Sequence, residues 1–291
     1  MHQYLRAVGF SNIENSKQVR DLLNDVIINP NRKDYIETGR GSILVEYTKY
    51  YCNSCGITLR GEYDDTDTLT LDFYYPFAQG DEVSTAEELC VERHSDKESF
   101  AAVCEDYRLG TTLIYYVQNG LNMMKYAEKG GFDQIKASTY LSGLSLGGTI
   151  MLPIKKDPKK KELLQKAYAD RNKRIIAAKN GDEEAIEQLT IEDIDTYSAV
   201  SKRIAKEDVF SLVDTYFMPN GVECDHYSVL AEILDYHLET NSLSSERVYS
   251  FVLNCNEILM TVCINEKDLL GEPEVGRRFH GNIWLQGEIR L

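Results

Sequence analysis

The last part of the chain carries its most regular pattern. Between Arg278 and Arg290, every second position is apolar or glycine: Phe279, Gly281, Ile283, Leu285, Gly287 and Ile289. A side-chain period of two is that of a β-strand with one buried face. Glycines on the buried side suit a strand that bends or that another backbone approaches closely, as in small barrels and curved sheets. We therefore predict a terminal strand over 277–289 that belongs to a small, curved β unit.

The segment before this strand is also rich in β-forming residues. It predicts further strands at Ser228–His237, Arg247–Asn254 and Glu257–Ile264. Together with the terminal strand, they predict a small β-rich C-terminal domain over 208–291. A barrel and a strongly curved sheet are both open as its form.

The N-terminal segment predicts a helix packed on a sheet. Apolar residues spaced by three and four positions mark a helix over 16–28, which Asn15 can cap. Runs of β-branched and aromatic residues follow at 42–51, 57–63 and 68–75, separated by short polar turns. The expected fold class is therefore α+β, with an N-terminal antiparallel sheet and packed helices.

The following segment is less regular. A short strand is predicted at 87–93, after which Ser95 and Glu98 predict a capped helix. That helix would carry Phe100, Val103, Cys104 and Tyr107. Residues 109–129 fit a helical stripe and also a hairpin turning at Asn119-Gly120, and we favour the helix.

Two more strands are predicted at 134–145 and 149–154, with a turn at Gly147-Gly148. They complete a first domain over 1–154. The composition then changes abruptly: residues 155–179 contain ten Lys or Arg and three acids, while 182–195 contain seven acids and no base. We predict a charged helical connector over 155–207.

Caps divide this connector into short helices. Asp182 is a suitable N-cap for one helix, and Thr190 with Asp193 resembles the start of another. The opposite charges of the two halves favour helices that fold back on each other. The basic half is interpreted as a solvated connector helix, with contact to RNA as the alternative.

The net charge of −15 argues against a broad nucleic-acid interface, since an acidic surface repels phosphate. No apolar run reaches the roughly 20 residues of a membrane span, and the start lacks a signal-peptide core. We expect a cytoplasmic protein without membrane association. Seven scattered cysteines then favour reduced thiols over a disulfide framework.

No catalytic constellation is recognisable, so enzyme activity is left uncertain and no cofactor is expected. Cys52 and Cys55 form the nearest approach to a metal motif, but a second such pair is missing. We interpret them as reduced thiols at a hairpin turn. Cys224, Asp225 and His226 are consecutive, but sequence does not show whether the imidazole faces the thiol.

The polar side of the terminal strand is the candidate binding surface. It presents Arg278, His280, Trp284 and Gln286, with Arg277 just before it. Tryptophan beside arginine is typical of a protein-binding hot spot. The alternative is that Trp284 packs against the connector or the first domain, because a single tryptophan is usually largely buried.

Stretches along the whole chain resemble a clostridial family known only as a domain of unknown function. They are residues 2–11, 193–197, 214–219, 268–279, 281 and 283–287. The resemblance implies a cytoplasmic bacterial protein of about this length, with no assigned activity or site residues to transfer.

The leading hypothesis is a non-catalytic binding or scaffold protein that contacts another protein. The alternative is an enzyme or small-molecule sensor with a pocket between its two domains. A metabolite-library screen for thermal stabilisation separates the two. The oligomeric state stays open.

Overall fold

The computed structural model groups the chain into two compact units, one formed by residues 1–151 with 215–291 and the other by 152–214. It describes residues 1–38, 42–93, 99–106, 108–109, 111–127, 135–154, 167, 170–171, 173–178, 180–204, 210 and 213–291. This grouping differs from the predicted division into 1–154, 155–207 and 208–291. The edges of the middle segment nearly agree, but the two outer ranges form one unit because their strands share a sheet.

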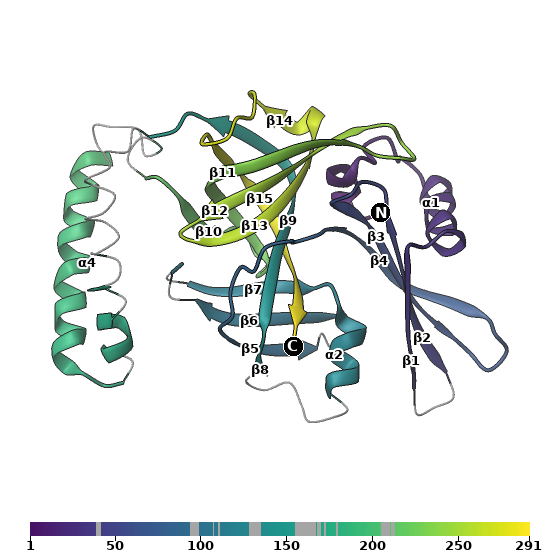
Figure 1. Ribbon diagram of the computed structural model, residues 1–291, viewed down its shortest axis with the longest axis horizontal. Helices are drawn as coiled ribbons and strands as arrows, with labels where there is room; N and C mark the ends of the chain where they lie inside the picture. Colours follow the sequence, from purple (N-terminus) through teal and green to yellow (C-terminus); the bar gives the residue numbers. More distant parts are fainter. Residues whose placement is uncertain are drawn as a thin grey trace. The chain divides into compact units, whose positions relative to one another are not determined.

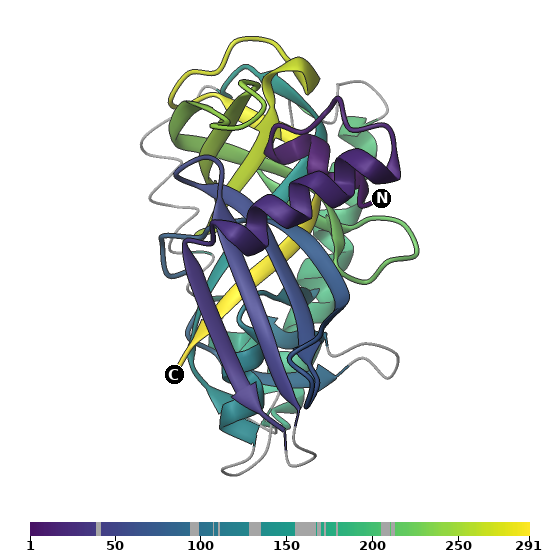
Figure 2. The ribbon, with the colours of Figure 1, turned by 90° about the vertical axis from the view of Figure 1, so that its right-hand side faces the viewer.

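The first unit begins with a short 3-10 helix, η1 (Gln3–Val8), and the helix α1 (Ser16–Ile28). As predicted, Asn15 caps α1: its side chain accepts from the backbone of Lys17 and Gln18, and Gln18 completes a capping box. Leu22 and Val26 are the buried residues of this helix. Figure 2 shows α1 lying across one face of the N-terminal sheet.

The N-terminal sheet is antiparallel, with its strands in sequence order. They are β1 (Arg32–Glu37), β2 (Ile43–Tyr50), β3 (Cys55–Tyr63) and β4 (Leu69–Ala78). The strands β2, β3 and β4 confirm the three predicted strands, whereas β1 was not predicted. Gly56 allows β2 and β3 to approach closely beside their connecting turn, because a Cβ there would lie 2.0 Å from the carbonyl oxygen of Lys49.

The second sheet contains the remaining strands of the first unit (Figure 1). Those from the N-terminal half are β5 (Glu88–Arg93), β6 (Phe100–Asp106), β7 (Thr111–Val117), β8 (Ile135–Lys136) and β9 (Ser138–Met151). Those from the C-terminal half are β10 (Tyr216–Pro219), β11 (His226–Thr240), β12 (Arg247–Cys255), β13 (Ile258–Asn265), β14 (Leu269–Leu270) and β15 (Arg278–Arg290). The four C-terminal strands predicted from the sequence are all present.

Five of these strands close a mixed barrel in the order β11-β12-β13-β9-β15, because β15 also pairs with β11. The β13–β9 pairing is parallel and the others are antiparallel. The barrel alternative is therefore the observed one, with β9 as its additional strand. The fold class is α+β and consists mostly of strands.

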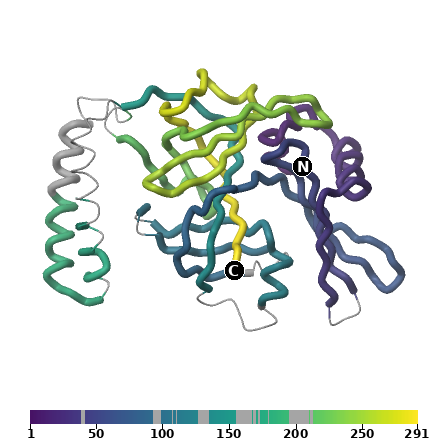
Figure 3. Tube along the Cα trace, viewed as in Figure 1, coloured from purple at the N-terminus to yellow at the C-terminus, as the bar shows by residue number. Residues whose placement is uncertain are grey.

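The strand β15 leaves the barrel and pairs with β7 through Gln286 and Gly287 (Figure 3). Its predicted apolar side is buried: Phe279, Ile283 and Leu285 are fully enclosed. Gly281 permits a close backbone approach, since a Cβ there would lie 2.7 Å from the carbonyl oxygen of Gly147. The middle of the opposite side is also buried, so β15 lies between two apolar clusters.

Three predictions in the middle of the chain were wrong. The helix predicted to carry Phe100 is the strand β6, whose buried side chains alternate with a period of two. Its predicted cap at residues 95–98 lies outside the described residues. Residues 111–117 form β7, and only Gly120–Ala127 is helical, as α2.

The third wrong prediction is the turn at Gly147-Gly148. β9 runs without interruption from Ser138 to Met151. Gly148 serves packing instead, because a Cβ there would lie 2.4 Å from the ring of Phe279. A glycine pair thus marks a close crossing between strands.

The second unit contains the helix α4 (Glu183–Ile204). Asp182 caps it through the backbone of Glu184 and Ala185, as predicted. The second predicted cap was wrong, since the helix continues through Thr190, whose hydroxyl donates to the Ile186 carbonyl oxygen.

Opposite charges pair within this unit, in agreement with the prediction that its helices fold back on each other. Arg171 contacts Asp193 at 2.7 Å, and Arg174 contacts Glu192 at 3.0 Å. Most of the predicted basic helix, 155–179, lies outside the described residues. In the part of the chain that the structure describes, no helix is both long and apolar enough to cross a bilayer.

Candidate metal centre

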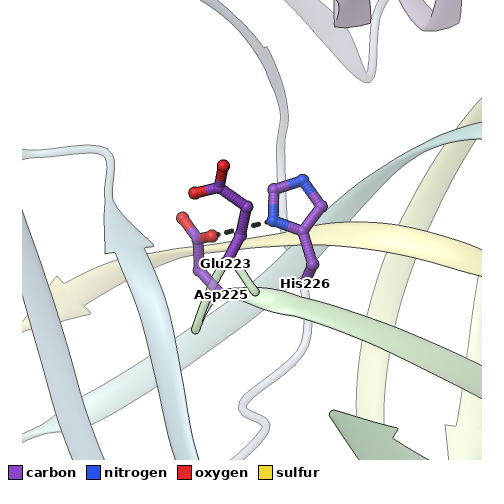
Figure 4. Close-up of side chains that lie close together, drawn as sticks. All are labelled: Glu223, Asp225 and His226. Carbon is purple, nitrogen blue, oxygen red and sulfur yellow. Dashed lines mark hydrogen bonds and ion pairs between the residues drawn. The ribbon is translucent and has the colours of Figure 1, made fainter. Parts of the chain in front are cut away.

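The loop between β10 and β11, together with the first residue of β11, brings together three side chains that can bind a metal ion: Glu223, Asp225 and His226 (Figure 4). One ligand atom from each lies within 4.8 Å of the other two. Among the described residues, this is the cluster of histidine, cysteine and carboxylate ligands that meets that distance.

The local sequence explains why the loop turns back tightly. The backbone amide of Asn220 donates to the carbonyl oxygen of His226 at 2.9 Å, which closes the hairpin. Gly221 then adopts a φ of 86°, a conformation that favours glycine. The turn places the exposed Glu223 beside the half-buried Asp225 and His226.

Asp225 is held from two sides. Its Oδ1 lies 3.0 Å from His226 Nδ1, and its Oδ2 accepts a 2.8 Å hydrogen bond from the indole Nε1 of Trp284. Burial raises the pKa of Asp225, but these two hydrogen bonds outweigh burial and leave the pKa below its usual value. The carboxylate is therefore anionic and oriented at neutral pH.

Aromatic rings cover the other side of the cluster. Trp284 packs against His2, Tyr4 and Tyr116, with ring centroids 5.0 to 5.3 Å away. The Tyr4 ring also lies 5.8 Å from the His226 ring. Burial, together with the negative charges of Asp225 and Glu223, raises the pKa of Tyr4 to about 12. Tyr4 is therefore a neutral phenol at physiological pH.

This donor set suits a divalent transition metal. One imidazole nitrogen and two carboxylate oxygens are ligands for Zn²⁺, Mn²⁺, Fe²⁺ and Co²⁺. Asp225 is additionally oriented by an indole N–H, and such outer hydrogen bonds are typical around metal ligands. Three protein ligands leave coordination positions for water or for a ligand atom.

Of the five residues predicted as a binding surface, Trp284 joins this cluster. It is only 6% exposed, so it packs inside the first unit. This is the arrangement that the alternative interpretation expected, with Trp284 against residues of the N-terminal segment.

The other four predicted residues lie elsewhere along β15. Gln286 is fully buried and bonds to Pro76, Ala78 and Gln118, while Arg278 is also buried. Arg277 is half-buried and pairs with Glu274 at 2.7 Å. His280 is half-buried, and burial lowers its pKa.

Of the predicted cysteine pair, Cys52 lies in the turn before β3 and Cys55 is the first residue of β3. Cys52 and Cys55 are both buried and reduced, as is Cys263 on β13. Hydrogen bonds with Cys263 and Cys52, together with burial, raise the pKa of the Cys55 thiol well above its usual value. This environment keeps Cys55 protonated, which disfavours reactivity as a thiolate.

Sequence reasoning considered Cys224 with His226 and missed Glu223. In the structure Cys224 is exposed, and His226 Nδ1 bonds to Asp225. The available signal was the presence of three metal-ligand residue types within four consecutive positions, 223–226. The contribution of Trp284 requires the strand register that pairs it with His226.

The family described as "Domain of unknown function, E. rectale Gene description (DUF3881)" matches residues 5–287, nearly the whole chain. No curated protein and no solved structure matches the chain. The comparisons therefore assign no ligand or activity to the site.

Proposed function

The chain belongs to this family of unknown function, and we propose from its own geometry that it is a binding protein whose ligand is a divalent transition-metal ion. The observation that supports this is the convergence of Glu223, Asp225 and His226 within 4.8 Å. Two carboxylates and one imidazole give a site of net negative charge, which a divalent cation neutralises.

The surroundings of Asp225 strengthen the proposal. Its hydrogen bond from Trp284 restrains Oδ2, and Oδ1 already faces His226 Nδ1, so little side-chain freedom is lost when a metal ion replaces that contact between Oδ1 and the imidazole. Glu223 is exposed, and it would become ordered when the ion binds. The bound ion would therefore connect the β10–β11 loop to β15 through Asp225 and Trp284.

This proposal keeps the predicted class of a binding protein and changes the expected ligand. A role as a scaffold for another protein stays a prediction, as does the cytoplasmic location. The buried position of Trp284 removes the central residue of the predicted protein-contact surface.

Trp284 provides a direct test because it is the single tryptophan of the chain. Tag-free protein is stripped with a chelator and titrated with Zn²⁺ and with Co²⁺ while tryptophan emission is recorded. We expect a saturable change with one ion per chain, and quenching by paramagnetic Co²⁺. A free ion at a hundred times its Kd adds about 2.7 kcal/mol to the free energy of unfolding, which raises Tm by about 5 °C.

Matched variants locate the site. His226→Ala and Glu223→Gln should each abolish or strongly weaken the saturable change. His237→Ala is the control, since His237 lies on the same strand in an exposed pair with Asp235 at 3.6 Å. A titration that is unchanged in His226→Ala, or that is lost equally in His237→Ala, contradicts the proposal.

A further inference from the structure

A cavity of about 690 Å³ lies within the first unit, apart from the residues of the metal centre. Its lining includes the end of β2 and the turn after it, from Tyr50 to Asn53, and the end of β11, from Leu238 to Thr240. Its volume falls within the range of roughly 300 to 1,000 Å³ that is usual for small-molecule sites.

Backbone hydrogen bonds hold these segments in place. The Ser242 amide donates to the Tyr51 carbonyl oxygen at 2.8 Å, which joins the β11–β12 turn to the β2–β3 turn. The Tyr50 amide donates to Asn31 Oδ1, also at 2.8 Å. The cavity is thus formed by elements that are already connected, so little conformational entropy of the protein is lost when a ligand binds.

The lining is polar and carries one charge. Amide side chains of Asn31, Asn53 and Gln79 line it, and Glu239 is the single acidic or basic side chain among its described lining residues. Such groups recognise hydroxyl, amide and amine functions by hydrogen bonding.

The two oxygens of the Glu239 carboxylate differ in their hydrogen bonds. Oε2 accepts from the backbone amides of Asn53 and Ser54, at 2.5 and 3.3 Å. In the described part of the chain, Oε1 takes part in no hydrogen bond or ion pair. Glu239 is half-buried, so a cation at Oε1 is partly shielded from water.

We propose that this cavity binds a small organic amine, whose ammonium group pairs with Glu239 Oε1. Hydroxyl or carbonyl groups of the same molecule bond to the amides of Asn31 and Gln79. The net charge of −15 raises the local concentration of cations and disfavours anionic ligands.

The test compares amines with neutral molecules of the same shape: glucosamine with glucose, choline with its neutral carbon isostere, and putrescine with butanediol. Binding to the full-length protein is measured by calorimetry at ligand concentrations up to about 1 mM, which detects weak sites. The proposal expects at least one amine to bind about five- to tenfold more tightly than its neutral partner. It is overturned if no amine exceeds its partner, or if glucose 6-phosphate binds better than glucosamine.

Two variants and a control assign the binding to this cavity. Glu239→Gln keeps an amide oxygen for Asn53 and Ser54 but removes the charge, so the preference for the amine should disappear. Ser242→Phe fills the cavity and should weaken both members of a pair. Glu14→Gln removes the same charge from an exposed side chain outside the cavity.

The Tm of each variant is first measured without ligand and should equal that of the wild type. A loss of binding is then not caused by unfolding. If Glu14→Gln weakens the amine as much as Glu239→Gln does, the binding reflects only net charge and the proposal fails. The same conclusion follows if Ser242→Phe leaves amine binding intact.

Discussion

The indole Nε1 of Trp284 donates a 2.8 Å hydrogen bond to Oδ2 of Asp225, which joins the last barrel strand to the loop that contains the candidate metal ligands. Because Trp284 is 6% exposed, native tryptophan emission should lie at short wavelength and resist quenching by iodide. Steady-state fluorescence with an iodide titration measures both properties. Emission resembling that of free tryptophan, with efficient quenching, would contradict this environment.

The lowered pKa of Asp225 predicts a pH dependence of stability. A carboxyl whose pKa is lower in the folded state stabilises the fold above its unfolded pKa of about 3.9. That contribution is lost as the pH falls through the lower, folded value. Asp225→Asn should therefore unfold about 1 kcal/mol more easily at pH 7, and the difference from the wild type should shrink near pH 3.

Urea unfolding of metal-free protein at several pH values measures this difference. Asp235→Asn is a suitable control, since Asp235 lies exposed on β11. A difference for Asp225→Asn that stays constant from pH 7 to about pH 2 would show that the carboxylate is not selectively stabilised in the fold.

A buried ion pair in the N-terminal sheet predicts that removing one partner destabilises the fold more than replacing both partners. Arg60 and Glu46 are each 2% exposed, and Arg60 Nη2 lies 2.7 Å from Glu46 Oε2. Glu46→Leu leaves a buried guanidinium without this partner and should cost about 3 to 5 kcal/mol of unfolding free energy. The double variant Glu46→Leu with Arg60→Met should recover much of that loss, as chemical denaturation can measure. A double variant as unstable as the sum of both single variants would contradict the argument.

Adjacent glycines in β9 provide a matched pair. A Cβ at Gly148 would lie 2.4 Å from the Phe279 ring, whereas nothing lies within 4 Å of a Cβ at Gly147. Gly148→Ala should destabilise the barrel by about 1 to 3 kcal/mol, and Gly147→Ala should change stability little. Thermal unfolding compares the two. Equal effects would mean that Phe279 does not pack against Gly148 as the structure shows.

Local patterns in the sequence predicted the elements whose signals are strong. The capping box at Asn15 and the alternation through Phe279 and Ile283 both correspond to observed structure. The prediction was wrong for residues 100–106, where the apolar spacing fits both a helix and a strand. Phe100 and Cys104 are four positions apart, as on one face of a helix, but they also belong to the alternating buried positions of the strand β6. Gly147-Gly148 was misread because a glycine pair suits both a turn and a close strand crossing.

Pairings between strands that lie far apart in the sequence could not be predicted from local patterns. The closure of the barrel depends on β9, which is separated by more than a hundred residues from β13, its parallel neighbour. Parallel pairings leave no turn signal in the sequence. Trp284 reaches Asp225 only through the β11–β15 register, so the candidate site appears when that pairing is known.

Anomalous diffraction from zinc-soaked crystals of the tag-free protein can show whether Glu223, Asp225 and His226 hold a metal ion. We expect one strong anomalous peak at about 2.0 to 2.2 Å from a carboxylate oxygen of Glu223, a carboxylate oxygen of Asp225 and an imidazole nitrogen of His226. A zinc ion bound at other residues while this loop is empty, or no ordered zinc at a saturating concentration, would contradict this expectation.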